Sequence, residues 1–324
     1  MNKKIFSLLM ILTMLFGAVH AEASDIVPNS FTDLLLAAKH YYNTNLAGDE
    51  ITLTHPKNNE YRFSGTKDGK SHYVTMVLKD WGVWNLGDMK FSDGRKEKTI
   101  IGGGTDWEYV FRVYVPTKQL LEFSGGNHGS EELVDIAFYD GETMEEIYLD
   151  VGGARSAKRI VVVEHTKLLD PGTLDPYANV QRTYTLFDTT VNLDTKIEFT
   201  TTVNMAMSYT AMACVNKDFG RYCEFDNGQI VTAEPKGVTG GKYLGRMDSM
   251  RCRLSGEDTS ATLTVGIFNK DDMTNGFSNF EKTFLWDMTD DFTKLYFSKY
   301  DLSSLTEVAE GTTWNLGAYW EANI

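Results

Sequence analysis

Residues 125–132, Gly-Gly-Asn-His-Gly-Ser-Glu-Glu, hold the densest group of chemistry-bearing side chains in the sequence. Glycines on both sides of His128 allow the backbone to turn sharply and to approach a ligand closely. A histidine and an acid on such a loop suit ligand binding or proton transfer, although a glycine-rich hairpin with a solvated histidine would give the same pattern. We predict that His128 and Glu131 act in catalysis and that Asn127 contacts substrate.

The same loop contains residue types that bind divalent metals. His128 and Glu131, with His165 as a further ligand, would form a metal site of imidazole and carboxylate groups. The sequence predicts no other cofactor, and neither a Cys-x-x-Cys motif nor a Cys/His zinc spacing is present.

Residues 107–115 precede this loop and alternate in the manner of a strand. On a pleated strand Glu108, Val110 and Arg112 would share one face. An acid, an arginine and aromatic rings on a sheet face can form a sugar-binding groove, because rings stack on pyranoses and charged groups hold hydroxyls or carboxylates. We predict that Arg112 is catalytic and that Trp107 and Glu108 contact substrate.

Two later strands contribute further candidates. The alternation of residues 160–167 places His165 on the face of Val161 and Val163, where it is either a catalytic base or a histidine hydrogen-bonded within the sheet. Arg182 and Tyr184 share a face by the same argument. We predict catalytic roles for His165 and Tyr184, and substrate contacts for Arg182.

Tyr209, in the alternating run 208–215, is a further substrate contact and an alternative to Tyr184 as proton donor.

The elements that must position these residues are almost all strands. Runs rich in Val, Ile, Thr, Tyr and Phe alternate with period two and are separated by turn signals such as Asp68-Gly69, Asp93-Gly94, Asp140-Gly141 and Asn227-Gly228. The expected strands are 72–79, 107–115, 133–139, 159–168, 182–187, 196–203, 208–215, 261–268 and 293–298. Many short strands without alternating helices predict an all-β fold, an antiparallel β-sandwich or jelly roll. Residues 170–176, rich in Asp, Pro and Gly, are expected to form a long crossover within one sandwich.

The N-terminal residues predict a signal peptide and a helix rather than strands. Lys3 and Lys4 precede an apolar run, and residues 19–21 form a small-x-small cleavage pattern, which is the layout of a bacterial secretory signal peptide cleaved after Ala21. The apolar run is too short to span a membrane comfortably. Residues 22–48 are expected to be a helical segment, with the helix at 29–47, and residues 49–324 the sandwich. We therefore expect a secreted or periplasmic protein without a transmembrane segment.

Composition excludes several classes of protein. The 324 residues are 42% hydrophobic with 6 Pro, so the chain is neither disordered nor of low complexity. A formal net charge of −14, with no basic block after the first residues, argues against nucleic acid as a partner. Three cysteines allow at most one disulfide, and Cys214–Cys223 could close the turn between two strands.

A signal peptide, a short helical lead-in, a β-rich body and His, Tyr and Arg residues on sheet faces are together similar in size and composition to the extracellular jelly-roll polysaccharide lyases. The resemblance implies β-elimination on a uronic-acid polysaccharide. That chemistry needs a cation to neutralise the uronate carboxylate (Arg112 or Arg182), a base (His128 or His165) and a proton donor (Tyr184 or Tyr209).

Two alternatives remain open from the residues. A glycoside hydrolase would need a carboxylate pair, for which Asp106, Glu108, Glu131 and Glu132 are available. A non-catalytic carbohydrate-binding or surface protein would use the same sandwich without turnover.

Overall fold

The alternating sequences form strands with one face inside and one face outside, as residues 160–169 illustrate. In this strand every second side chain from Ile160 to Leu168 is buried, while the intervening ones are partly exposed. The computed structural model describes residues 49–104, 106–247, 249–268 and 282–324. The expected signal peptide and the expected helix at 29–47 lie outside the described residues.

The described strands pair antiparallel in two sheets, which confirms the predicted all-β fold class. The larger sheet runs, in spatial order, through β16 (Lys242–Met247), β19 (Lys282–Asp287), β20 (Phe292–Val308), β13 (Val203–Asn216), β5 (Glu97–Ile101), β4 (Trp84–Ser92), β3 (Lys70–Leu78), β2 (Glu60–Lys67), β1 (Ile51–Lys57) and β9 (Ala154–Ala157), with β6 (Val110–Val115) paired to β13 and to β7 (Leu120–Ser124).

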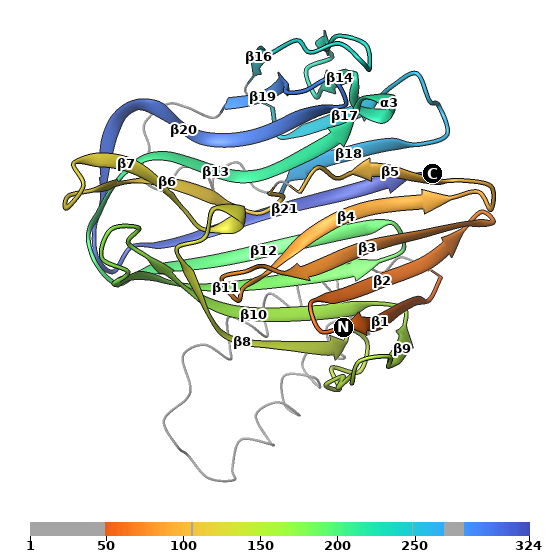
Figure 1. Ribbon diagram of the computed structural model, residues 1–324, viewed down its shortest axis with the longest axis horizontal. Coiled ribbons are helices and arrows are strands. Elements are labelled where there is room, and N and C mark those ends of the chain that lie inside the picture. Colours follow the sequence, from red (N-terminus) through yellow and green to blue (C-terminus); the bar gives the residue numbers. More distant parts are fainter. Residues whose placement is uncertain (1–48, 105, 248, 269–281) are drawn as a thin grey trace, which may run out of the picture. The chain divides into compact units, whose positions relative to one another are not determined.

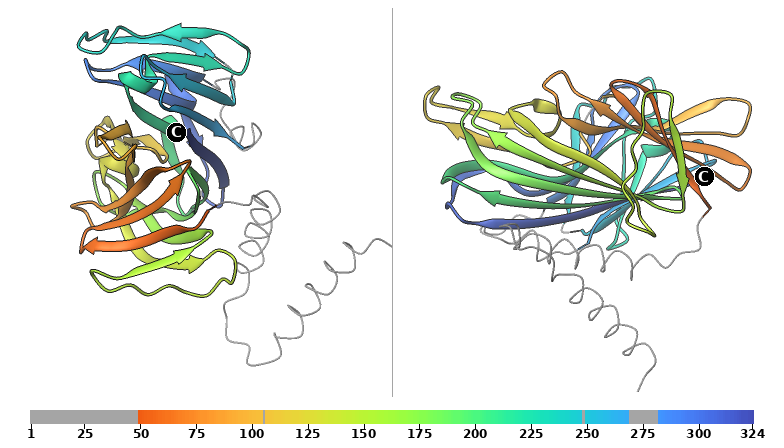
Figure 2. Two further views of the ribbon diagram at one scale, coloured as in Figure 1. Left: turned by 90° about the vertical axis from the view of Figure 1, so that its right-hand side faces the viewer. Right: turned by 90° about the horizontal axis from the view of Figure 1, so that it is seen from below.

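The smaller sheet lies against the larger one (Figures 1 and 2). Its order is β15 (Ile230–Thr232), β14 (Tyr222–Phe225), β17 (Arg251–Ser255), β18 (Thr262–Ile267), β21 (Thr313–Asn323), β12 (Thr190–Phe199), β11 (Pro176–Phe187), β10 (Ile160–Leu169) and β8 (Glu131–Asp140). The described helical elements are short: the 3-10 turn η1 (Gly126–His128) and α3 (Lys217–Gly220). No helix in the described part of the chain is long and apolar enough to cross a membrane.

The interior lies between the two sheets. Leu295 and Phe297 of β20 belong to one buried apolar cluster there with residues of the smaller sheet such as Val265 and Trp320. Their neighbours in the sequence, Lys294 and Tyr296, project from the opposite side of the larger sheet, and Tyr296 belongs to a separate apolar cluster. We call that side, which faces away from the smaller sheet, the outer face.

The turn signals are confirmed, but one connection differs from expectation. Asp68-Gly69, Asp93-Gly94, Asp140-Gly141 and Asn227-Gly228 each lie at or just after the end of a strand, and each of these glycines except Gly141 has a positive φ. Residues 170–175 form a tight turn rather than a long crossover, because β10 and β11 are neighbours paired along their whole length. The expected strand at 196–203 is also wrong in its boundary, since β12 ends at Phe199 and β13 begins at Val203.

Cys214 and Cys223 are not bridged in the structure. Cys223 packs in the interior between the sheets, whereas the sulfur of Cys214 lies beneath Gly103 on the other side of β13. The two side chains therefore point into different parts of the molecule, and the expected disulfide does not fit this arrangement.

Candidate functional site

Strand β6 brings the first predicted site residue to the outer face. Val110 belongs to the outer-face apolar cluster, whereas Tyr109 and Phe111 pack in the interior. Arg112, two residues after Val110, therefore also lies on the outer face and is partly exposed there. Its neighbour across the strands on one side is Met207 of β13, and on the other side it is Phe123 of β7.

The histidine loop folds back towards this face as the 3-10 turn η1, the short coil beside β6 in Figure 1. Gly125, Gly126 and Gly129 all have positive φ, so the predicted role of glycine in turning this loop is confirmed. A Cβ at Gly126 would lie 2.7 Å from Asp106 Oδ1, which makes the close approach of Asp106 dependent on glycine. The same Oδ1 accepts a hydrogen bond from the Asn127 backbone N–H.

Asp106 connects the loop to β20. Its Oδ2 atom lies 3.6 Å from His128 Nε2 and 3.5 Å from Lys294 Nζ. Asp106 and Lys294 have side chains only 3% and 8% exposed, whereas the His128 side chain is 40% exposed. The arrangement is a buried ion pair with a solvent-facing imidazole on one side of it.

The environment of His128 favours its neutral form. Burial lowers the pKa of the imidazole, Asp106 opposes this effect and Lys294 adds to it, and the net result is a pKa below the usual 6.5. The ring is then uncharged at neutral pH and can accept a proton.

The side chains of His128 and Arg112 both pack against the ring of Phe123. The His128 and Phe123 rings stack with centroids 4.3 Å apart, and the Arg112 guanidinium carbon lies 5.2 Å from the Phe123 centroid. Tyr209 of β13 lies opposite Val110 and is partly exposed, so its phenol belongs to the same face. We call His128, Asp106, Lys294, Phe123 and Arg112 the His128 cluster.

Four of the predicted residues, His128, Arg112, Asn127 and Tyr209, therefore lie on this face. The Asn127 side chain is partly used within the loop, since its amide donates to the Gly104 carbonyl at 2.5 Å. Lys294 and Phe123 were not predicted from the sequence. The alternation of 293–298 does place Lys294 beside Tyr296, but no local pattern pairs it with Asp106, which lies 188 positions earlier.

Of the other predicted residues, Glu131, Arg182, Glu108 and Tyr184 form a second polar group inside the sandwich, together with Glu164, which was not predicted. Arg182 Nη2 lies 3.2 Å from Glu131 Oε1 and 3.0 Å from Glu164 Oε2, and all three side chains are 0% exposed. Glu108 and Tyr184 lie alongside, with the Tyr184 hydroxyl donating to Glu108 Oε1 at 3.2 Å. We call these five residues the Arg182 cluster.

Hydrogen bonds hold the carboxylates of the Arg182 cluster in place. Glu131 Oε1 accepts from the Tyr109 hydroxyl at 2.8 Å and from the Thr166 hydroxyl at 2.5 Å. Glu164 and Glu108 accept from backbone N–H groups of β4, those of Trp84 at 3.0 Å and Leu86 at 2.8 Å. Burial raises the pKa of Glu164 to about 8, although the Arg182 charge acts in the opposite direction.

The predicted substrate or catalytic roles of Glu131, Arg182, Tyr184, Glu108 and Trp107 do not fit these positions. All five side chains are buried between the sheets, where a polysaccharide cannot reach them. Glu108 departs from the expected face because β6 begins only at Val110, so the strand pleat does not extend back to residue 108.

His165 belongs to neither the His128 cluster nor the Arg182 cluster. It projects from the solvent side of the smaller sheet, where its Nδ1 lies 2.7 Å from Asp135 Oδ1, and both side chains are exposed, at 41% and 62%. The prediction that His165 joins His128 in one catalytic site is therefore not supported by its position.

The expected metal site does not form either. Glu131 points into the interior, His128 lies on the outer face of the larger sheet, and His165 lies on the far side of the smaller one. Within the described residues no group of three or more His, Cys, Asp or Glu side chains is arranged to hold a metal ion.

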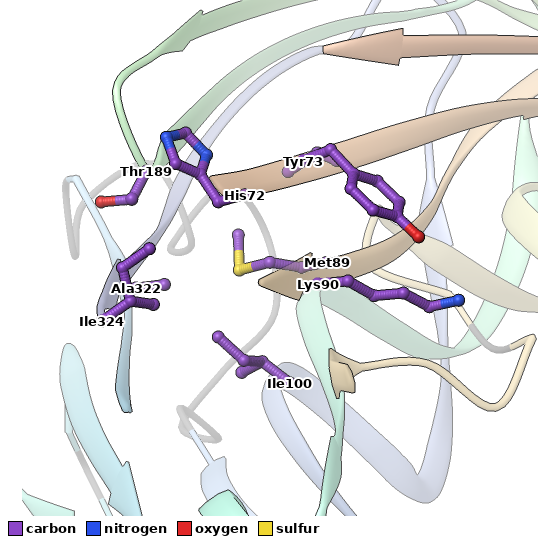
Figure 3. Close-up of a pocket in the computed structure, with 9 residues that line it drawn as sticks. His72, Tyr73, Met89, Lys90, Ile100, Thr189, Ala322 and Ile324 are labelled. Carbon is purple, nitrogen blue, oxygen red and sulfur yellow. The ribbon is translucent and has the colours of Figure 1, made fainter. Parts of the chain in front are cut away.

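Figure 3 shows a small hollow in the structure. Side chains of both sheets line it, among them His72, Met89, Ile100 and Ile324. Its volume of about 10 Å³ is at the lower limit for one water molecule, so it is too small to hold a sugar ring.

No protein-family model matches the chain, and a search of curated proteins gives no significant match. Among solved structures it is similar to the galactosidase domain of an alpha-galactosidase–sucrose kinase, with 9% identity over 81% of this chain and 40% of that one and a TM-score of 0.45. An alpha-galactosidase from Lactobacillus brevis gives 9% identity, coverage of 83% and 40%, and a TM-score of 0.46.

A galactose mutarotase-like protein from Clostridium acetobutylicum gives 9% identity, coverage of 82% and 95%, and a TM-score of 0.43. The chain thus spans about 40% of the length of the galactosidase structures. At these identities and TM-scores, the similarities assign neither an activity nor a substrate to the chain.

Proposed function

We propose that this chain is a carbohydrate-active protein, a polysaccharide lyase that cleaves a uronic-acid-containing glycan at the His128 cluster. The observation that supports this most is the Phe123 ring, against which both a solvent-facing neutral histidine and an arginine pack. A base and a carboxylate-binding cation on one exposed sheet face are the two groups that β-elimination on a uronate requires. The expected signal peptide is consistent with a polymeric substrate outside the cytoplasm.

In the proposed reaction Arg112 binds the uronate carboxylate, which makes the proton on the adjacent carbon, C5, more acidic. His128 removes this proton, the C5–H electron pair forms the C4=C5 double bond, and the bond from C4 to the glycosidic oxygen breaks. Tyr209 donates a proton to the departing oxygen. Asp106 is a positioning residue: it orients the imidazole and stabilises the imidazolium that forms, while Lys294 balances its charge.

The hydrolase alternative loses most of its candidate carboxylates. Glu108 and Glu131 are sealed between the sheets, and Asp106 is 3% exposed and already paired with Lys294. Glu132 is exposed and follows the inward-pointing Glu131 on β8, so its side chain projects from the solvent side of the smaller sheet. An exposed pair flanking a scissile bond is therefore not available among the four acids considered.

The test is an assay of unsaturated product, followed by the ultraviolet absorbance of the new C4=C5 bond, on alginate, polygalacturonate and hyaluronan. Wild-type protein is expected to form this product from at least one of them, and His128→Ala to lower kcat by about a hundredfold, the usual scale for a lost general base. Because the pKa of His128 is lowered, kcat/KM should rise with pH through an inflection below 6.5.

Release of reducing ends without unsaturated product would contradict the lyase proposal and favour hydrolysis. Binding of a polymer without any cleavage would favour a non-catalytic carbohydrate-binding protein.

A further inference from the structure

We propose that a row of aromatic rings on the outer face, running from the edge strand β16 to the His128 cluster, forms glycan-binding subsites for the substrate. We call this row, Tyr243, Trp286, Phe284 and Tyr296, the aromatic strip. The inference rests on the proposed function, because it names how the same substrate would be held.

The aromatic strip follows neighbouring strands towards Lys294. Tyr243 of β16 lies opposite Trp286 of β19, and Trp286 lies opposite Lys294 of β20. Neighbouring strands are about 4.8 Å apart, so one ring per strand gives a row that steps across the sheet. Lys294 is the residue that contacts Asp106, and so the row ends at the His128 cluster.

The rings contact one another along the row. The centroids of Tyr243 and Trp286 are 5.6 Å apart with an angle of 31° between the ring planes. Phe284 and Tyr296 stack behind them at 4.8 Å and 14°, and Tyr209 continues the row 4.8 Å from Tyr296. Tyr209 is the proposed proton donor. The aromatic strip therefore adjoins the proposed proton donor at Tyr296 and the Asp106–Lys294 pair beside the proposed base at Trp286.

The exposure of the aromatic strip distinguishes it from core packing. Phe284 and Tyr296 are 6% and 7% exposed and form the base of the strip, whereas Tyr243 is 58% exposed and Trp286 is partly exposed. The tryptophans of the interior, Trp107 and Trp320, are 0% exposed. A large ring on the solvent side that rests on buried rings has a rigid position and an available face, which suits stacking against a pyranose.

The occupant we infer is a uronic-acid polysaccharide, with several sugar units bound on the side of Tyr243 and Trp286. Arg112 supplies a cation next to the reacting unit, while the strip itself offers apolar faces for the units beyond it. A polymer longer than the reacting units would gain affinity from these rings, and a short oligosaccharide would not reach them.

The test compares chain lengths. Tyr243→Ala and Trp286→Ala are each expected to raise KM for polymeric alginate, polygalacturonate or hyaluronan by about tenfold, the loss of one good aromatic contact, with kcat and the KM for a trisaccharide unchanged. Tyr148→Ala is the matched control, because Tyr148 is an exposed ring (80%) on the turn after β8. Trp286→Phe keeps a ring, so its KM for the polymer should stay close to the wild-type value. This variant also tests the proposal if Trp286→Ala does not fold.

Calorimetric titration of the His128→Ala protein with the same polymers separates this proposal from the preceding one. Binding that weakens with Tyr243→Ala, in a protein whose wild type makes no unsaturated product, would overturn the lyase proposal and support the strip. Normal lyase activity with an unchanged KM in both ring variants would overturn the strip alone. Wild-type protein that neither binds nor cleaves any of the three polymers would overturn both.

Discussion

The His128 cluster and the Arg182 cluster contain similar residue types but differ in what surrounds them. In the Arg182 cluster the arginine, Glu131 and Glu164 are 0% exposed, and the carboxylates accept hydrogen bonds from backbone and hydroxyl groups. In the His128 cluster only Asp106 and Lys294 are buried, and the imidazole remains 40% exposed. In the Arg182 cluster the charged groups pair with one another, whereas in the His128 cluster the imidazole of His128 and the guanidinium of Arg112 remain accessible to a ligand.

This difference shows why residue type alone does not identify a site. A buried arginine with two carboxylate neighbours is an internal structural element, because removing any partner would leave a charge in a medium that solvates it poorly. A histidine whose partner is buried but whose ring faces water can exchange protons with a substrate. The comparison therefore predicts stability effects for one cluster and activity effects for the other.

The largest expected effect is on stability, from Arg182→Met. Methionine roughly fills the space of the arginine stem but leaves the Glu131 carboxylate buried without its cation, which typically costs about 3–5 kcal/mol. Urea denaturation followed by tryptophan fluorescence should show this loss in the free energy of unfolding. Arg112→Met is the control on the outer face and should change the free energy of unfolding by less than about 1 kcal/mol. Equal losses in the two variants would remove the distinction between the clusters.

The next effect is on activity, from Arg112→Ala. If Arg112 neutralises the uronate carboxylate, its loss should lower kcat by about a hundredfold, as for other groups that stabilise developing charge. Arg112→Lys, which keeps the charge but not the planar fork, should recover part of this loss. A kcat for Arg112→Ala within a factor of two of wild type would exclude this role.

A smaller effect is expected on the pH dependence of stability, through Glu164 of the Arg182 cluster. The pKa of Glu164 is raised by burial from 4.5 to about 8, so between these pH values the folded state binds a proton that the unfolded state has lost. The free energy of unfolding should therefore decrease as the pH rises from about 4.5 to about 8. Glu164→Gln, which mimics the protonated form, should make this profile flatter. A steeper decrease in the variant would contradict the assignment.

Strand alternation accounts for what the sequence could predict. It correctly places Val110 and Arg112 on one face, and likewise Arg182 with Tyr184 and His165 with Val161 and Val163. Alternation does not say which of two faces is the interior when both carry polar residues. The burial of Arg182, which was expected in a substrate groove, could not be foreseen. Its buried partners, Glu131 and Glu164, come from two other strands and are not visible in the local pattern.

The long-range contacts of the His128 cluster could not be predicted for the same reason. The glycines around His128 predict the turn, and the turn is present with positive φ at Gly125, Gly126 and Gly129. The Asp106–Lys294 contact depends on β20 and the segment before β6 coming together across 188 positions, which no local pattern encodes. Lys294 was missed on this account, whereas Phe123 is a local neighbour, paired with Arg112 across the β6–β7 hairpin and five positions before His128.

The smallest expected effect is for His165→Ala, and it tests whether exposure and position rather than residue type define the site. His165 pairs with Asp135 at 2.7 Å, a geometry that would suit a catalytic base, but both side chains are exposed on the solvent side of the smaller sheet. Surface pairs of this kind contribute little to stability, so the free energy of unfolding should change by less than about 0.5 kcal/mol. Because the His128 cluster lies on the other sheet, kcat and KM on the uronic-acid polymers should also remain at the wild-type values. A hundredfold fall in kcat for His165→Ala, with His128→Ala unaffected, would move the active site to the smaller sheet and would reverse the comparison between the two histidines.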